Sequence, residues 1–207
     1  MTETLKDLVI LVADKDMEES IKALLSRPEA LGIRPVDCDI YVHPYRDPGC
    51  LGGAEEFLRF AIRSHAHALV LFDREGCGSL SSVEALAQIV QAKLANNGWR
   101  DQCAVIVLDP ELEVWVWSDS PHVDEVLGWR ENHPPLREWL GQQGYVGAGE
   151  NKPSRPKEAM EEVLRAGGKP RSSSLYRQLA ERVSLRGHQE PAFLKLCAVL
   201  QGWFPRE

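Results

Sequence analysis

The sequence predicts an α/β fold, with a mostly parallel four-stranded sheet, helices on both of its faces and a helical C-terminal region. Two features lead to this prediction. Apolar runs at residues 8–12, 68–72 and 103–108 are typical of strands that are buried on both faces. Segments with helical patterns separate these runs, and such an alternation predicts parallel strands joined by helical crossovers.

The elements expected before residue 100 follow from local patterns. Residues 36–42 alternate apolar and polar side chains, which predicts a strand exposed on one face. Ser81 and Glu84 form a capping box that begins a helix, and Asn97-Gly98 ends it. The expected order is a strand at 8–12, a helix ending near residue 27, a strand at 36–42, a loop rich in proline and glycine at 43–53, a helix at 54–64, a strand at 68–72 and a helix to about residue 96.

The pattern becomes helical after the apolar run at 103–108. Helices are expected at 123–127, 136–142, 157–165, 174–183 and 191–201, and a stretch rich in glycine and proline resembles a linker at 144–156. We therefore divide the chain into an α/β domain at 1–143, the linker-like stretch at 144–156 and a helical region at 157–207. We expect the helical region to pack on the α/β body.

The composition is that of an ordinary globular protein. Hydrophobic residues make up 43% and charged residues 27% of the 207 residues. The apolar runs are far shorter than the roughly 20 residues that span a bilayer, and the polar N-terminal segment has no signal-peptide core. Five scattered cysteines form no C-x-x-C pair, so neither a zinc knuckle nor a disulfide framework is expected. We expect a cytoplasmic protein that does not associate with membranes.

The two parts of the chain differ in charge. Residues 1–149 carry 13 Lys and Arg against 24 Asp and Glu, whereas residues 150–207 carry 11 against 7. An acidic body with a mildly basic C-terminal part is compatible with a phosphate-containing partner. A solvated helix surface with excess basic residues is the alternative.

Carboxylates follow three of the predicted strands at the point where each strand ends. Parallel strands end at the same edge of a sheet, so these groups are expected to meet there. They are Asp14, Asp16, Glu18 and Glu19 after the first strand, Asp73 and Glu75 after the central strand, and Asp109, Glu111 and Glu113 after the fourth. Alternate residues of an extended segment lie on the same side, so Asp73 and Glu75 are expected to converge.

Converging carboxylates predict a bound cation, because they repel one another unless a proton or a cation lies between them. Oxygen ligands favour Mg²⁺ or Mn²⁺, and such ions activate water and stabilise charge in phosphodiester cleavage. The alternative is that the acids are solvated strand ends without a ligand. The expected metal ligands are Asp14, Glu18, Asp73, Glu75, Glu111 and Glu113.

This arrangement of acids resembles the TOPRIM fold of topoisomerases, primases and related nucleases. In that family one acid follows the first strand and an Asp-x-Asp pair follows a later hydrophobic strand. The chain looks like the small TOPRIM-like proteins linked to phage defence, and in particular like a component of a methylation-associated anti-phage system. Their motif P-x-x-E-x-W is matched by Pro110, Glu113 and Trp115, and their Pro-Lys-Glu tail is matched by residues 156–158.

The resemblance implies a TOPRIM-like fold, Mg²⁺-dependent cleavage of nucleic acid and other defence proteins as partners. It makes Asp14, Asp73, Glu75 and Glu113 the expected catalytic residues. The first motif reads Asp14-Lys15 where Glu-Gly is usual, and the second motif ends in Glu instead of Asp. Two alternatives remain open, a working nuclease and a catalytically degenerate subunit that binds a larger defence partner.

Basic residues near these motifs predict contacts with nucleic-acid phosphates. The expected nucleic-acid-binding residues are Lys15, Lys152, Arg155 and Lys157, with a solvated basic surface as the alternative. No Walker A or G-x-G-x-x-G motif is present, so no nucleotide cofactor is expected.

Two further groups have both a structural and a functional interpretation. His65 and His67 precede the central strand, where a surface turn is expected in preference to a metal site. Tyr45, Arg46 and Asp47 belong to the loop rich in proline and glycine. That loop is expected to be an ordinary crossover, and the alternative is that it reaches over the acidic edge.

Overall fold

The sheet is built from four parallel strands. A computed structural model of the chain describes residues 5–118, 120–147, 149–150, 152–185 and 189–206. The strand order is β2-β1-β3-β4, and every neighbouring pair is parallel, which confirms the predicted α/β class. The strands are β1 (Lys6–Val12), β2 (Cys38–Val42), β3 (His65–Asp73) and β4 (Cys103–Leu108).

The register of the sheet explains why its inner strands are so apolar. Ile10 of β1 pairs with Ile40 of β2 and with Leu69 of β3, and Leu69 in turn pairs with Ala104 of β4. Ile10 and Leu69 are fully buried because helices cover both faces of the sheet. Every residue of the outer strand β2 is half-buried, so the alternation of its sequence does not appear as one buried and one exposed face.

Helices follow the strands and then continue to the end of the chain. They are α1 (Lys15–Leu25), α2 (Pro28–Leu31), α3 (Arg46–Phe57), α4 (Val83–Leu94), α5 (Pro121–Val126), α6 (Leu136–Gln142), α7 (Pro156–Ala166), α8 (Ser173–Arg182) and α9 (Pro191–Trp203). Within the described ranges, no helix combines the length and the apolar character needed to cross a membrane.

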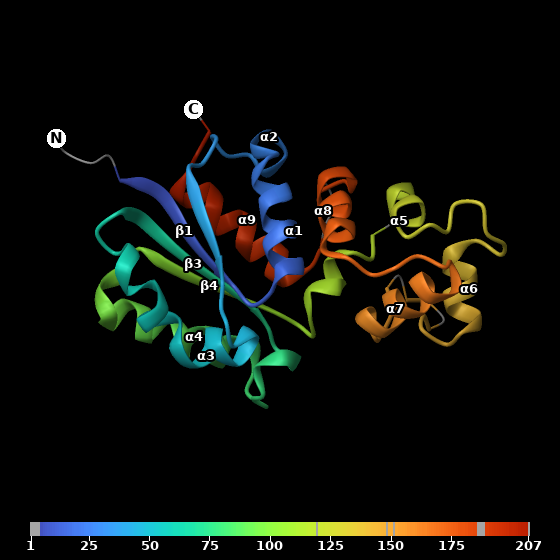
Figure 1. Ribbon diagram of the computed structural model, residues 1–207, viewed down its shortest axis with the longest axis horizontal. Helices are drawn as coiled ribbons and strands as arrows, with labels where there is room; N and C mark the ends of the chain where they lie inside the picture. The colour runs from blue at the N-terminus through green and yellow to red at the C-terminus, as the bar shows by residue number, and fades with distance from the viewer. Residues whose placement is uncertain (1–4, 119, 148, 151, 186–188, 207) are drawn as a thin grey trace.

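The last helix of the chain returns to the sheet. Ile10 and Leu69 of the sheet lie against Ile21 of α1 and against Leu196 and Leu200 of α9. Helices α1 and α9 therefore share one face of the sheet, whereas α3 and α4 pack together on the other face (Figure 1).

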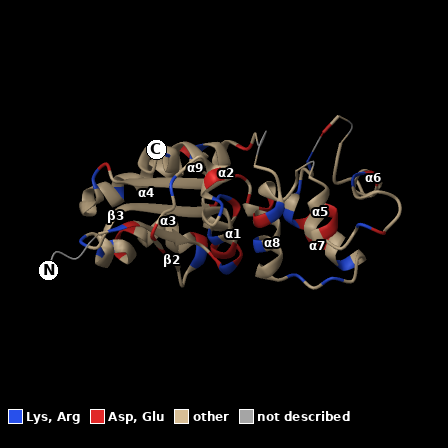
Figure 2. Cartoon of the chain, turned by 90° about the horizontal axis from the view of Figure 1, so that it is seen from above, with Lys and Arg blue, Asp and Glu red and all other residues tan. Residues whose placement is uncertain are grey.

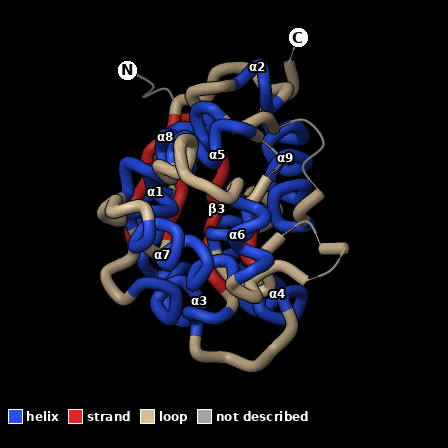
Figure 3. Tube along the Cα trace, turned by 90° about the vertical axis from the view of Figure 1, so that its right-hand side faces the viewer, coloured by secondary structure: helices blue, strands red, loops and turns tan. Residues whose placement is uncertain are grey.

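Helices α5 to α8 lie together at one end of the molecule, beyond the point where the strands end (Figures 1 and 3). Helix α8 packs on α1 and on α5. Acidic and basic residues lie close together where α1 meets α8 (Figure 2), and Arg177 of α8 pairs there with Glu19 of α1 (3.8 Å). Within the stretch at 144–156, of which residues 148 and 151 lie outside the described residues, backbone groups bond to one another. Its Ser154 N–H donates a hydrogen bond to Tyr145 O (3.0 Å). Helices α5 to α8 thus lie at the carboxyl edge of the sheet (Figure 1).

Two local predictions are wrong. The segment rich in proline and glycine is not a loop, because α3 begins at Arg46. Gly49 of this helix lies so close to the ring of His43 that a Cβ would be 1.9 Å from Nδ1, so the glycine serves close packing. His65 and His67 belong to β3 and not to a surface turn, and His65 is buried.

The start of α4 is displaced by one residue from its predicted position. Ser82 is the N-cap in place of Ser81, and its Oγ accepts a hydrogen bond from Ala85 N–H (3.2 Å). The helix then continues as a π-helical turn, in which Gly98 has a φ of 120° that favours glycine.

Candidate functional site

Five carboxylates converge where the parallel strands end. They are Asp14 after β1, Asp47 after β2, Asp73 at the end of β3, and Glu111 and Glu113 after β4. The charges on the other four all act on Asp73. The structure therefore brings four of the predicted residues together and adds Asp47 to them.

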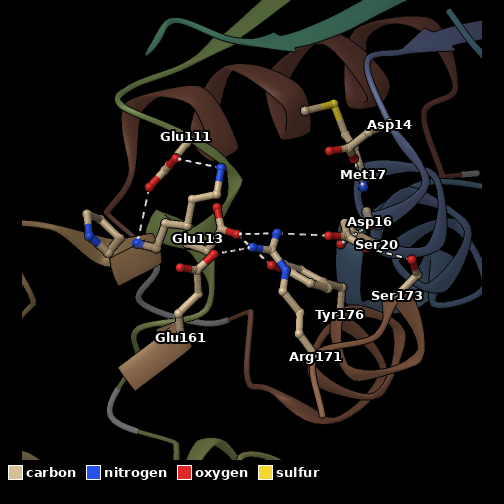
Figure 4. Close-up of polar contacts among 12 residues, drawn as sticks. Asp14, Asp16, Met17, Ser20, Glu111, Glu113, Glu161, Arg171, Ser173 and Tyr176 are labelled. Atoms are coloured by element: carbon tan, nitrogen blue, oxygen red, sulfur yellow. Dashed lines mark hydrogen bonds and ion pairs between the residues drawn. The ribbon is translucent and has the colours of Figure 1, made fainter. Parts of the chain in front are cut away.

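Asp14 is held in place by the helix that it begins. Its Oδ1 accepts a hydrogen bond from Met17 N–H (2.9 Å), which is the usual N-cap contact (Figure 4). Because β1 ends only two residues earlier, at Val12, the cap fixes this carboxylate at the carboxyl end of the strand.

Asp47 is bound to the last residue of β3. Its Oδ1 accepts a hydrogen bond from Asp73 N–H (2.7 Å). This carboxylate has room because residue 76 is glycine, and a Cβ on Gly76 would lie 2.3 Å from Asp47 Oδ2. Burial raises the pKa of Asp47 and the charge on Asp14 raises it further, while the Asp73 N–H group lowers it.

Asp73 has a buried carboxylate oxygen that no other group of the described residues contacts by a hydrogen bond. Its Oδ1 has no hydrogen-bond partner. Burial, followed by repulsion from Asp47, Glu113 and Asp14, raises the pKa of Asp73 well above its usual range. A buried charge without a partner is costly, so this carboxyl group requires either a proton or a cation.

Glu113 is satisfied by residues from the helical region. It is 2% exposed, and its Oε1 accepts hydrogen bonds from Tyr176 Oη (2.5 Å) and Arg171 Nη2 (3.0 Å) (Figure 4). Arg171 also binds Asp16 Oδ2 (3.0 Å) and Glu161 Oε1 (2.8 Å). Burial and the charge on Glu113 raise the pKa of Tyr176, so its hydroxyl group remains a donor.

Glu111 binds the first turn of α7. Its Oε1 accepts a hydrogen bond from Lys157 N–H (3.1 Å), and its Oε2 accepts one from Lys157 Nζ (3.3 Å). Burial and the charge on Glu113 raise the pKa of Glu111, and Lys157 opposes them. Glu111 thus joins the segment after β4 to the helical region.

Two predicted ligands have other surroundings. β3 ends at Asp73 and a 3₁₀ turn follows, so the extended geometry assumed for Asp73 and Glu75 does not hold. Glu75 is exposed, and the charges that raise the pKa of Asp73 most are those of Asp47, Glu113, Asp14 and Glu111. Glu18 binds Lys15 Nζ (2.7 Å) and Lys22 Nζ (2.5 Å). Although burial alone would raise the pKa of Glu18, these two bonds lower it.

The four predicted nucleic-acid contacts are paired with acids of this chain. The ion pairs are Lys15 with Glu18, Lys152 with Glu190, Arg155 with Glu158 and Lys157 with Glu111. Lys15 and Arg155 lie on the surface, and Lys152 and Lys157 are half-buried. Each of these charges is therefore balanced within the protein.

Three residues that shape the site are absent from the sequence-based predictions of site residues. Asp47 is expected in a crossover loop, with a position over the acidic edge as the alternative, and the structure places it beside Asp73 at that edge. Arg171 and Tyr176 bind Glu113 although they lie 58 and 63 residues from it in the sequence. No local pattern predicts contacts at such a separation.

The donor atoms suit a hard divalent cation. Mg²⁺ and Mn²⁺ prefer carboxylate oxygens, and Asp73 Oδ1 is a buried oxygen without another partner. The other carboxylates whose charges act on Asp73 are, in order of effect, Asp47, Glu113, Asp14 and Glu111. Among the residues that the structure describes, no three His, Cys, Asp or Glu side chains are already arranged to hold a metal ion. Binding would therefore require side chains of the cluster to move.

Comparison of the chain with known protein families, curated proteins and solved structures found no match in any of the three.

Proposed function

We propose that the acidic edge binds Mg²⁺ or Mn²⁺ and hydrolyses phosphodiester bonds in nucleic acid. The observation that carries the proposal is the buried, unpartnered Oδ1 of Asp73 among four other carboxylates. Lys157 and Arg171 contribute two positive charges next to these five acids. A divalent cation would supply the positive charge that Asp73 lacks.

Asp14, Asp47 and Asp73 would hold the ion, with Glu113 beside them. A bound ion of this kind lowers the pKa of water and neutralises charge on a phosphodiester. The residues of the chain provide the geometry, since the α1 cap orients Asp14 and the bond from Asp73 N–H orients Asp47. Tyr176 in turn holds Glu113.

The biological setting of this proposal is anti-phage defence in a prokaryote. Its support is the resemblance of Pro110, Glu113 and Trp115, and of the acids at the strand ends, to TOPRIM-like motifs. Nucleic acid and other defence proteins are the proposed partners. A host that carries the complete system with Asp73→Asn should then lose protection against phage in a plaque assay.

A cleavage assay tests the activity. Wild type, Asp73→Asn and Glu75→Gln are incubated with single- and double-stranded DNA and RNA in Mg²⁺, Mn²⁺ or EDTA. We expect ion-dependent cleavage by wild type and by Glu75→Gln, because Glu75 is exposed outside the cluster. Asp73→Asn should be slower by about a hundredfold or more, in line with the loss of one transition-state contact. If wild type cleaves as fast in EDTA as in Mg²⁺ or Mn²⁺, the proposal is refuted. It is also refuted if Asp73→Asn cleaves as fast as wild type.

A second candidate function is that of a non-catalytic interaction subunit. It is favoured by Lys157 and Arg171, which already bind Glu111 and Glu113. On this alternative, Mn²⁺ leaves the melting temperature of wild type unchanged. Deleting residues 157–207 is not a suitable test, because α9 buries Leu196 and Leu200 against the sheet.

A further inference from the structure

Arg171 joins the acidic edge to the helices that cover it. Its guanidinium group binds Asp16 on α1, Glu113 in the segment after β4 and Glu161 on α7 (Figure 4). It also lies over the ring of Tyr176, 5.5 Å from the ring centre. A planar guanidinium group with charged partners on several sides forms strong and directional hydrogen bonds. Arg171 is therefore held firmly beside Glu113.

Lys157 has the same role next to Glu111. It binds this carboxylate through both its backbone N–H group and its Nζ atom. The charge of Lys157 also reaches Asp47, whose pKa it lowers. Both cations belong to the helical region, and both bind acids that follow β4.

These ion pairs oppose the binding of a metal ion at the same edge. Glu113 offers Oε1 to Arg171 and Tyr176, and the charge on Glu113 also acts on Asp73. Arg171 Nη2 lies 3.0 Å from Glu113 Oε1, so a divalent ion that took Glu113 as a ligand would meet this positive charge, and like charges repel strongly in a partly buried site. Loss of Arg171 would leave Asp16 and Glu113 with uncompensated negative charge, which attracts a cation.

We propose that Arg171 and Lys157 are built-in counter-cations that compete with a divalent ion for Glu113 and Glu111. In this way the C-terminal helices lower the metal affinity of the acidic site until these ion pairs break. The inference rests on the proposed metal site and adds a means of regulating it. Any partner that draws these two cations away from the acids raises the metal affinity, by thermodynamic linkage.

Titration with Mn²⁺ alone tests the competition, with free Mn²⁺ measured by electron paramagnetic resonance. We expect Arg171→Gln to bind Mn²⁺ about tenfold more tightly than wild type, because one repelling charge is removed. Lys157→Gln should show a smaller gain, since its backbone N–H group still binds Glu111. Arg171→Lys keeps the charge but not the planar guanidinium group, so it should bind Mn²⁺ more weakly than Arg171→Gln does. The matched control is Arg177→Gln, an exposed arginine of α8 that pairs with Glu181 (2.8 Å).

The outcomes separate this inference from the proposed function. If Arg171→Gln binds Mn²⁺ no more tightly than wild type, the inference is overturned. The metal site itself still stands in that case, provided that Asp73→Asn abolishes wild-type binding. Binding by Arg171→Gln but not by wild type would support the inference, and binding by neither protein would overturn both proposals. Thermal melting checks that each variant folds, and Lys157→Gln carries the test if Arg171→Gln does not fold.

Discussion

Replacing Asp73 by asparagine removes a charge that the metal-free fold does not compensate. Asp73 Oδ1 is buried without a partner, and four carboxylates raise the pKa of this group. Asparagine has nearly the same shape but no charge, and its amide group can donate hydrogen bonds to neighbouring carboxylates. We therefore expect Asp73→Asn to be more stable than wild type in the absence of metal.

The magnitude follows from the cost of the unpartnered group. An unsatisfied buried polar group costs about 1–3 kcal/mol, and a charged one costs more. Because asparagine keeps an oxygen at the same place, we expect a gain of about 1–2 kcal/mol. In a chain of 207 residues this corresponds to a rise in melting temperature of roughly 2–8 °C.

The gain should depend on pH. The pKa of Asp73 is higher in the folded protein than in the unfolded chain, where it is about 3.9. Wild type therefore loses stability as the pH rises from that value through the folded-state pKa, and the loss is complete above it. The difference between Asp73→Asn and wild type should accordingly be small in acid and largest at alkaline pH.

Urea denaturation in EDTA at pH 5 and pH 8.5 measures this difference, with Glu75→Gln as an exposed control. With Mn²⁺ at a hundred times its Kd, wild type and Glu75→Gln should each gain about 2.7 kcal/mol, and Asp73→Asn should gain nothing. A variant that is less stable than wild type at pH 8.5 in EDTA would show that the carboxylate of Asp73 is compensated, which contradicts the argument.

Three other predictions concern the surroundings of the site and the opposite end of the sheet. Tyr176→Phe removes a donor to a buried carboxylate (2.5 Å), so urea denaturation should show a loss of about 1.5–3 kcal/mol. Gly76→Ala places a Cβ 2.3 Å from Asp47 Oδ2, and thermal melting should show a loss of about 1–3 kcal/mol from overpacking. Burial lowers the pKa of His67, which stacks on Trp203, so the unfolded chain is protonated first and stability falls as the pH drops below about 6.5. His67→Phe should reduce this dependence, as measured by unfolding free energies between pH 5 and pH 7.5.

The chain offers a matched control for each of these changes. Tyr45→Phe alters an exposed ring and should leave stability unchanged. Gly52→Ala meets no atom within 4 Å and lies inside α3, so it should be neutral or stabilising. His122→Phe alters an exposed histidine and should keep the pH dependence of wild type. If a control changed stability as much as its matched variant, the corresponding explanation would be contradicted.

Elements with a strong local signal were predictable from sequence. The apolar run at 103–108 became β4 (Cys103–Leu108), and the amphipathic segment at 136–142 became α6 (Leu136–Gln142). In these short segments the local pattern of apolar and polar residues was enough to specify a strand or a helix. The start of α3 was not predictable, because Gly49 looks like a loop residue until the ring of His43 is packed against it.

The sequence alone determined that acids follow several parallel strands, and the rule that such strands end at one edge was enough to bring Asp14, Asp73 and Glu113 together. Only the tertiary structure decided which acids are buried and what neutralises them. Asp47 binds Asp73, which lies 26 residues away in the sequence, and Arg171 binds Glu113, which lies 58 residues away. The physical reason is that hydrophobic periodicity specifies strands and helices locally, whereas the balance of buried charge depends on the side chains that folding brings together.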